Sequence, residues 1–400
     1  MVRLSNWHRD HICEVAFLKF RIVLLSFIWL FMLAIVAGAI WLLWLDAPTA
    51  PSEQPRISAA ESRATRLALQ PPKRQRPLIA IIGLNDATET TDYLTPYGVL
   101  KRANVADVIA VATEDAPVRL YPALTVRADA TVAEFDRQFP EGADYIIVPA
   151  MSRDDDPAVL GWLRAQKAQG ATIIAVCAGA KVVAQAGLLD GKRATTHWYY
   201  RDALIKKHPD IQYVPNRRWV VDDGIVTTTG ISASMPMMLT LIEAITDSQT
   251  AQRVARDLGV SSWGAEHDSG VFHFNRPFAL TVMKNSLALW NKERFVLPLH
   301  ADMDEVTLAL VADAWSRTYL SEVATVSAGN APITTQHGLQ IIPDQTIDAA
   351  NSRTGLTIDP FTPPETALRQ TLDAIAARYG KPTASVVAMQ MEYPWFRSAP

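Results

Sequence analysis

Residues 173–184 constrain the fold more than any other part of the chain. They begin with an apolar run rich in β-branched residues, reach Cys177, and continue through Ala178 and Gly179 into an apolar helical pattern. This order is typical of a buried parallel strand that turns sharply into a helix. Cys177 falls on the turn, where the beginning of the following helix lowers the pKa of a thiol. The pattern predicts a nucleophilic cysteine at an elbow, and a buried, inert cysteine is the alternative.

The sequence around this elbow alternates between buried strands and helices. The predicted strands are 78–83, 108–112, 145–149, 172–176 and 225–229, and the predicted helices are 92–103, 132–138, 157–169 and 237–245. Such alternation predicts a parallel sheet covered on both faces. Active sites of such sheets lie at the carboxyl ends of the strands. Because Asp92, Ala150 and Cys177 each follow a predicted strand end, we expect them to converge.

An apolar segment without a single charge occupies residues 22–45 and is long enough to cross a bilayer, which takes about 20 residues. Four basic residues precede it: Arg3, Arg9, Lys19 and Arg21. The positive-inside rule therefore predicts a cytoplasmic segment 1–21, a single-pass signal anchor, and main domains on the exported side, which is the periplasm in a bacterium. A cleaved signal peptide is the alternative, but its apolar region is typically only about 7–15 residues long. Residues 46–77 are rich in proline and predict a linker, with some helix as an option between Ala59 and Leu69.

The composition argues against several classes of function. The net charge of −3 over 400 residues gives no sign of a nucleic-acid partner. The two cysteines, Cys13 and Cys177, lie on opposite sides of the apolar segment, so neither a disulfide framework nor a zinc spacing is expected. His267 and His273 are close in the sequence, which is weak evidence for a metal site. We therefore expect no metal and no other cofactor.

Several short segments match one protein family in order along the chain. They are DYLTP at 92–96, VIAVA at 108–112 with DAP at 115–117, AVCAG at 175–179, AGLLDG at 186–191 and ATTHW at 194–198. Residues 78–246 thereby resemble the ThiJ/PfpI family of the class I glutamine-amidotransferase-like superfamily. The resemblance implies a flavodoxin-like α/β sandwich, which we assign to residues 78–258.

The resemblance also implies roles for three residues. Cys177 would be the nucleophile, and Asp92 would lie against its sulfur, sharing a proton with it or acting as a general acid or base. His197 would accept or deliver a proton, or merely orient a ligand. From the residues alone, Asp92 could instead be a solvated carboxylate in a first helical turn, and His197 a structural histidine that bonds the backbone.

Two positions around the expected pocket depart from the family pattern. The family usually has a glycine pair after the strand that ends at Pro149, where a backbone N–H helps to bind an oxyanion, whereas this chain has Ala150 and Met151. We expect the Ala150 amide to remain available and Met151 to narrow the pocket. Ala178, which precedes Gly179, stands where isonitrile-hydratase-like members have threonine, whereas glyoxalase- or deglycase-like members tolerate alanine.

The resemblance thus implies a membrane-anchored hydrolase or lyase of the glyoxalase or deglycase type, acting on a small electrophilic molecule. The alternative is a noncatalytic ligand or redox sensor, because residues 195–198 are also similar to the ligand-sensing domain of AraC-type transcriptional regulators. Those regulators carry a helix-turn-helix module after this domain. No basic paired-helix pattern follows residue 260, so we expect no DNA binding. A homodimer is an open option.

The C-terminal third resembles part of the first domain at a constant offset of 215 in residue number, so that residue n of the first copy corresponds to residue n + 215 of the second. Matching pairs are Leu124 and Leu339, Asp129 and Asp344, and Thr131 and Thr346. The pattern predicts adjacent parallel strands at 295–299 and 323–326, joined by a helix at 306–319. We interpret residues 292–400, which follow a connecting segment at 259–291, as a truncated and inactive copy. It has no cysteine, and Thr307 takes the place of Asp92; chance similarity is the alternative.

Overall fold

The computed structural model describes residues 4–50, 55–350 and 354–395. The other parts of the expected segments, residues 1–3, 51–54, 351–353 and 396–400, lie outside the described residues. The chain divides into two compact units, Met1–Pro48 with Phe274–Ala279, and Thr49–His273 with Leu280–Pro400. Each unit is described by itself.

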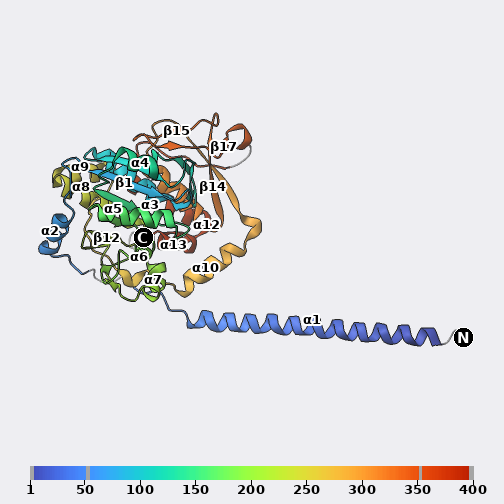
Figure 1. Cartoon of the computed structure of the whole chain (residues 1–400). Coiled ribbons are helices and arrows are strands. Elements are labelled where there is room, and N and C mark those ends of the chain that lie inside the picture. The colour runs from blue at the N-terminus through green and yellow to red at the C-terminus, as the bar shows by residue number, and fades with distance from the viewer. Residues whose placement is uncertain (1–3, 51–54, 351–353, 396–400) are drawn as a thin grey trace. The chain divides into compact units, whose positions relative to one another are not determined.

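The first unit is dominated by the long helix α1 (Leu4–Trp44) (Figure 1). Its part Arg21–Trp44 has a mean hydropathy of 2.7 and none of it is buried. By length and composition this is one helix able to cross a membrane, and it covers nearly all of the apolar segment predicted from the sequence. After the helix, the carbonyl of Asp46 accepts a hydrogen bond from the N–H of Arg276 at 3.1 Å.

A seven-stranded sheet forms the centre of the second unit, in the order β11-β12-β8-β7-β1-β3-β6. Its strands are β1 (Leu78–Gly83), β3 (Asp107–Ala112), β6 (Ala130–Thr131), β7 (Tyr145–Val148), β8 (Thr172–Ala175), β11 (Trp219–Asp222) and β12 (Ile225–Thr228). All neighbours pair in parallel except β11 and β12, which are antiparallel. The predicted parallel sheet is confirmed, with this antiparallel edge as a correction. A tight turn at residues 223–224 allows the reversal of direction.

Helices cover both faces of this sheet. Successive side chains of a strand point to opposite sides, so neighbouring residues of β1 pack with different sets of helices. In β1, Ile79 and Ile81 pack with α3, α8 and α9, whereas Ala80 and Ile82 pack with α4, α5 and α6. These helices are α3 (Thr90–Ala103), α4 (Val132–Gln138), α5 (Pro157–Ala168), α6 (Gly179–Gln185), α8 (Ser234–Ile245) and α9 (Ser248–Leu258). Every residue of β1, β7 and β8 is buried, as a strand covered on both faces requires.

A second sheet has the order β17-β14-β13-β18. Its strands are β13 (Glu293–Pro298), β14 (Ser321–Ser327), β17 (Gln345–Thr346) and β18 (Thr354–Gly355), and its helices are α11 (Glu305–Ser316), α12 (Pro364–Tyr379) and α13 (Lys381–Gln390). β13 and β14 are adjacent and parallel and are joined by α11, which confirms the predicted strand–helix–strand unit.

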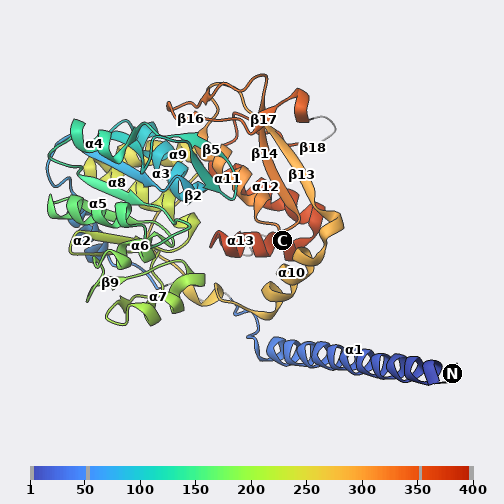
Figure 2. The ribbon, with the colours of Figure 1, turned by 45° about the vertical axis from the view of Figure 1, so that its right-hand side comes forward.

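A third sheet combines strands from both parts of the second unit, in the order β15-β16-β5-β4-β2. Its strands are β2 (Asp86–Glu89), β4 (Val118–Tyr121), β5 (Thr125–Arg127), β15 (Ile333–Thr334) and β16 (Gln340–Ile341). β16, from the C-terminal third, pairs antiparallel with β5 of the first domain, and the two lie side by side in Figure 2. Besides short 3-10 helices, the other described elements are α2 (Ala59–Ala68), α7 (Arg201–Lys207), α10 (Arg276–Leu287), β9 (Arg193–Ala194) and β10 (Gln212–Tyr213).

Candidate functional site

Cys177 occupies the strained elbow that the sequence predicts. It lies between β8 and α6 with φ of 57°, a left-handed conformation that a non-glycine residue rarely adopts. Its N–H donates to Oγ1 of Thr228 at 3.1 Å, and its carbonyl accepts from Oγ1 of Thr196 at 3.1 Å. A Cβ at Gly179 would overlap the carbonyl oxygen of Val148, so this position needs a glycine. The surroundings therefore hold the strained backbone from two sides, as is typical of functional sites.

Asp92 projects from the first turn of α3 and is completely buried, so the solvated alternative is wrong. Its Oδ2 accepts the N–H of Ala150 at 3.1 Å, whereas its Oδ1 has no hydrogen-bond partner within the described part of the chain. Burial raises the pKa of Asp92 to about 7. Among the described residues no hydrogen bond joins Asp92 to the Cys177 sulfur, and the expected close approach of these two side chains stays a prediction.

The thiol of Cys177 is only 4% exposed, and burial raises its pKa well above the usual range. The neighbouring carboxyls of Asp92 and Glu89 raise the pKa further, and the backbone of Ala178 lowers it. The backbone at the start of the helix thus lowers the thiol pKa as expected, but other effects are larger and the net shift of the pKa is upward. Desolvation and two carboxyls outweigh the backbone N–H groups of a short helix.

A carboxylate–arginine cluster lies beside Asp92 and consists of Glu89, Asp313 and Arg317. Arg317 Nη2 is 2.6 Å from Glu89 Oε1, and its Nε is 2.6 Å from Asp313 Oδ2. Glu89 also caps α3, because its Oε2 accepts the N–H of Asp92 at 2.5 Å. Burial raises the pKa of both carboxyls. Burial lowers the pKa of Arg317, but the two carboxylates raise it by more, so the guanidinium stays charged.

Sequence reasoning missed this cluster. Glu89 stands shortly before Asp92 at the start of a predicted helix, which is a recognisable capping signal. Arg317 and Asp313 reach the site from α11, in the C-terminal third of the chain. The only signal for them was the repeat, in which Arg317 is the counterpart of Arg102.

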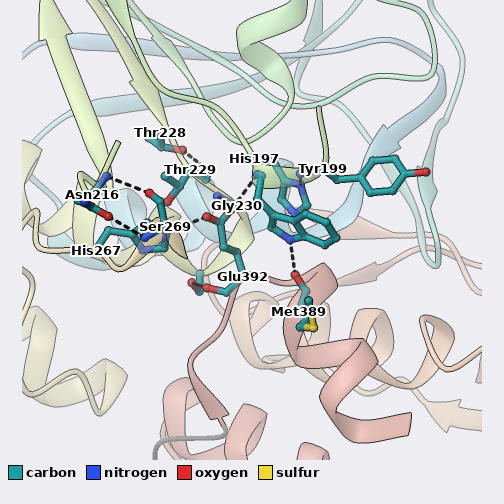
Figure 3. Close-up of polar contacts among 12 residues, drawn as sticks. His197, Tyr199, Asn216, Thr228, Thr229, Gly230, His267, Ser269, Met389 and Glu392 are labelled. Carbon is teal, nitrogen blue, oxygen red and sulfur yellow. Dashed lines mark hydrogen bonds and ion pairs between the residues drawn. The ribbon is translucent and has the colours of Figure 1, made fainter. Parts of the chain in front are cut away.

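The backbone holds His197 on both sides of its ring, and Figure 3 shows His197 with Tyr199 on one of them. Its Nδ1 accepts the N–H of Tyr199 at 3.2 Å, and its Nε2 donates to the carbonyl of Gln390 at 2.9 Å. Burial lowers the pKa of His197, so the ring is neutral. With both nitrogens engaged, the geometry matches the structural alternative for this histidine rather than a proton shuttle to Cys177.

Glu392, just after α13, holds the segment that carries His197 in place. It is buried in the left-handed conformation, with φ of 53°. Its Oε2 accepts the N–H of Gly230 at 2.6 Å, and its Oε1 lies 2.7 Å from Nε2 of His267 (Figure 3). Burial raises the pKa of Glu392, but His267, His197 and the Gly230 N–H together more than offset this, and the pKa is lowered. No group of three metal-ligating side chains occurs among the described residues, and His273 faces the Gly270 carbonyl instead, at 3.0 Å.

The backbone amide expected to bind an oxyanion is already engaged. The Ala150 N–H donates to Asp92, and the Ala150 carbonyl accepts the N–H of Glu89 at 2.9 Å. Met151 forms an isolated bridge with Thr88. An oxyanion could therefore use the Ala150 amide only after Asp92 had released it.

A parallel sheet with helices on both faces, a cysteine at a strained strand–helix elbow and a buried acid beside it define a class of α/β domains with a cysteine elbow. A sequence model of the DJ-1/PfpI family matches residues 79–244. These residues form a DJ-1/PfpI family domain, which confirms the predicted resemblance to the ThiJ/PfpI family.

Individual relatives cover only parts of the chain. Isonitrile hydratase of Pseudomonas putida is 41% identical over 105 residues, which are 26% of this chain and 44% of that protein. The HTH-type transcriptional regulator CdhR of Pseudomonas aeruginosa is 37% identical over 99 residues, 25% of this chain and 29% of the regulator. The chain thus spans less than half the length of these two relatives.

Solved structures with similar folds include DJ-1beta of Drosophila melanogaster, at 21% identity and a TM-score of 0.42, covering 46% of this chain and 99% of that structure. An AraC family transcriptional regulator from Pseudomonas putida matches at 19% identity and a TM-score of 0.40, covering 45% and 98%.

Proposed function

We propose that the DJ-1/PfpI domain binds a small electrophilic molecule and acts on it, with Cys177 as the nucleophile and Asp92 as the proton carrier. One observation carries this proposal. Asp92 is a buried acid with an unpartnered oxygen and a pKa of about 7, placed beside a cysteine in a strained conformation. The unpartnered carboxyl oxygen and the strained backbone each destabilise the folded state. Such unfavourable features are concentrated at functional sites.

The two groups suit addition to a carbonyl compound. The sulfur of Cys177 bonds to the carbonyl carbon while the carbon–oxygen π bond opens. The thiol proton passes to ionised Asp92, and from Asp92 to the new alkoxide oxygen. An acid with a pKa near 7 can both accept and deliver a proton at neutral pH. Because Asp92 occupies the Ala150 amide, protonation by Asp92 replaces stabilisation of a free oxyanion, which favours glyoxalase- or deglycase-like chemistry.

The test is turnover of methylglyoxal by the full-length chain in detergent, alongside an isonitrile as a second substrate. Cys177→Ser should abolish turnover, and Asp92→Asn should lower it by about 100-fold or more. Asp115→Asn, at an exposed turn, is the matched control and should have no effect. The native rate should also change with pH around the pKa of Asp92, about 7, and Asp92→Asn should remove that change. Full turnover by Cys177→Ser would refute the proposal.

A noncatalytic ligand sensor is the second candidate, supported by the similarity to CdhR. A sensor would turn over neither compound, but its ligand would protect Cys177 from iodoacetamide in a saturable manner. The redox form of this hypothesis is weaker, because redox-sensing thiols have low pKa values and are accessible, whereas Cys177 is buried with a raised pKa.

We further propose that α1 anchors the chain in a membrane, with a cytoplasmic N-terminus and the DJ-1/PfpI domain on the exported, periplasmic side. The support is the apolar helix Arg21–Trp44 together with the excess of basic residues ahead of it.

Finally, we propose that residues 292–400 are a truncated copy of the DJ-1/PfpI domain. Its elements from β13 to β17 follow the first copy at the same constant offset, so that β13 corresponds to β1, and Glu305 at the start of α11 is the counterpart of Thr90 at the start of α3. A long-range hydrogen bond also recurs. Asp129 Oδ2 accepts the N–H of Ala110 at 2.8 Å, and Asp344 Oδ2 accepts the N–H of Thr325 at 2.7 Å. Without a cysteine, the copy has no nucleophile of its own.

A further inference from the structure

We infer that the two copies pack on each other as the subunits of a symmetric dimer do, within one chain, and that the C-terminal copy supplies Arg317 as a positioning residue for the site around Cys177. This inference rests on the proposed truncated copy and on the site of the proposed function. It assigns a role to α11 that neither of them contains.

The pairing of the third sheet marks the axis of this symmetry. β5 and β16 are counterparts at the constant offset, and they pair antiparallel with each other. In their register Val126 lies opposite Ile341, which is its own counterpart. A residue that faces its own counterpart lies on a two-fold axis, as in the isologous interface of a homodimer.

The helices that follow the first strand of each copy, α3 and α11, pack against each other and begin in the same way. Glu89 caps α3 by accepting the N–H of Asp92, and Asp304 caps α11 by accepting the N–H of Thr307 at 2.7 Å. Glu89 and Asp304 are counterparts, and so are Asp92 and Thr307. Each copy therefore begins this helix with an acidic cap just ahead of the position of the proposed proton carrier.

Ion pairs are exchanged between the copies in both directions. Arg317 of α11 pairs with Glu89, and its counterpart Arg102 of α3 pairs with Asp304, the counterpart of Glu89. In a symmetric interface, if one residue contacts a second, then the counterparts exchange the same contact. These two pairs meet that condition within a single chain.

The two ion pairs differ in the residues that neighbour their carboxylates, Glu89 and Asp304. Behind Glu89 are Asp92 and Cys177, whose pKa values respond to this cluster of charges. Behind Asp304 is Thr307, in a copy without a cysteine. Arg317 thus balances charge at the working site and fixes the Glu89 cap of α3, whereas Arg102 has only a structural part.

Arg317→Gln and Arg102→Gln are therefore matched variants, each losing an ion pair of the same kind. The measurement is the rate of Cys177 alkylation by iodoacetamide against pH, on the full-length chain in detergent with Cys13→Ser, so that Cys177 alone reports. Loss of the cation beside two carboxylates should raise the thiol pKa and slow alkylation by about tenfold for every unit by which that pKa rises. Below the thiol pKa, Cys177 of Arg317→Gln should be alkylated at least about tenfold more slowly than in the parent chain. The alkylation rate of Arg102→Gln should equal that of the parent within about twofold.

Arg317→Lys keeps the charge and should restore most of the rate, which a purely structural role would not predict. If Arg317→Gln does not fold, Arg317→Lys and Arg102→Lys form the second pair of matched variants. Only Arg317→Lys should then slow the alkylation of Cys177, by about threefold. Equal profiles within either folded pair would overturn the inference. The readout needs no turnover, so a failure of the proposed enzyme activity leaves this test intact.

Discussion

At the scale of single residues, the site holds groups in states that an ordinary protein interior avoids. Asp92 has a carboxyl oxygen without a partner in the described part of the chain, and Cys177 has a left-handed backbone. Around them Glu89 and Asp313 share the cation Arg317. A buried carboxyl with a raised pKa links the protonation of the site to the stability of the fold.

Asp92→Asn tests that linkage. The pKa of Asp92 is about 7 in the folded chain against an ordinary value of 3.8, so the folded state binds this proton more tightly. The resulting stability is fully present below about pH 4 and is lost as the pH rises through about 7. At about 1.4 kcal/mol per pKa unit, the loss is roughly 4.5 kcal/mol.

The Asn variant lacks this proton. We therefore expect its stability, relative to the native chain, to rise between about pH 4 and pH 8, as measured by denaturant unfolding. Asp115→Asn should show no such trend. A constant difference between Asp92→Asn and the native chain across this range would contradict the raised pKa.

At the scale of elements, the elbow depends on the close approach of α6 to β7. A Cβ at Gly179 would overlap the Val148 carbonyl, whereas a Cβ at Gly161 in α5 would meet nothing within 4 Å. The two glycines lie in neighbouring helices, but only one of them is required by packing.

Gly179→Ala should therefore lower the free energy of unfolding by about 2–3 kcal/mol, the usual cost of overpacking. Gly161→Ala should raise it by up to about 1 kcal/mol, because alanine favours a helix over glycine. Thermal unfolding of both variants measures the difference. Equal melting temperatures would show that α6 can move away from the sheet at no cost.

The same scale shows what the sequence could predict. The bounds of β1 and α4 match their predictions because a buried apolar run and a capped short helix are local signals. β4 and β5 lie outside the strands predicted from the sequence, and the pairing of β5 with β16 involves a segment from the far end of the chain. Cys177 and Asp92 could be predicted, but the states of their protons depend on burial and on Arg317, which no local pattern encodes.

At the scale of the whole molecule, the proposed topology makes a clear prediction. Alkaline phosphatase fused after residue 400 should be active, because it folds only outside the cytoplasm, and a cytoplasmic reporter fused there should be silent. Replacing the four basic residues before the apolar helix by glutamine should weaken this orientation. An active cytoplasmic reporter on the native chain would exclude the export of the DJ-1/PfpI domain.

The exchange of ion pairs between α3 and α11 has a consequence for how the protein behaves when it is scarce. The stability of an obligate homodimer depends on protomer concentration, and dilution separates its subunits. Here both sides of the Arg317–Glu89 contact belong to one polypeptide. The guanidinium therefore meets its carboxylate at the same frequency whether a cell holds a handful of copies of the chain or a great many.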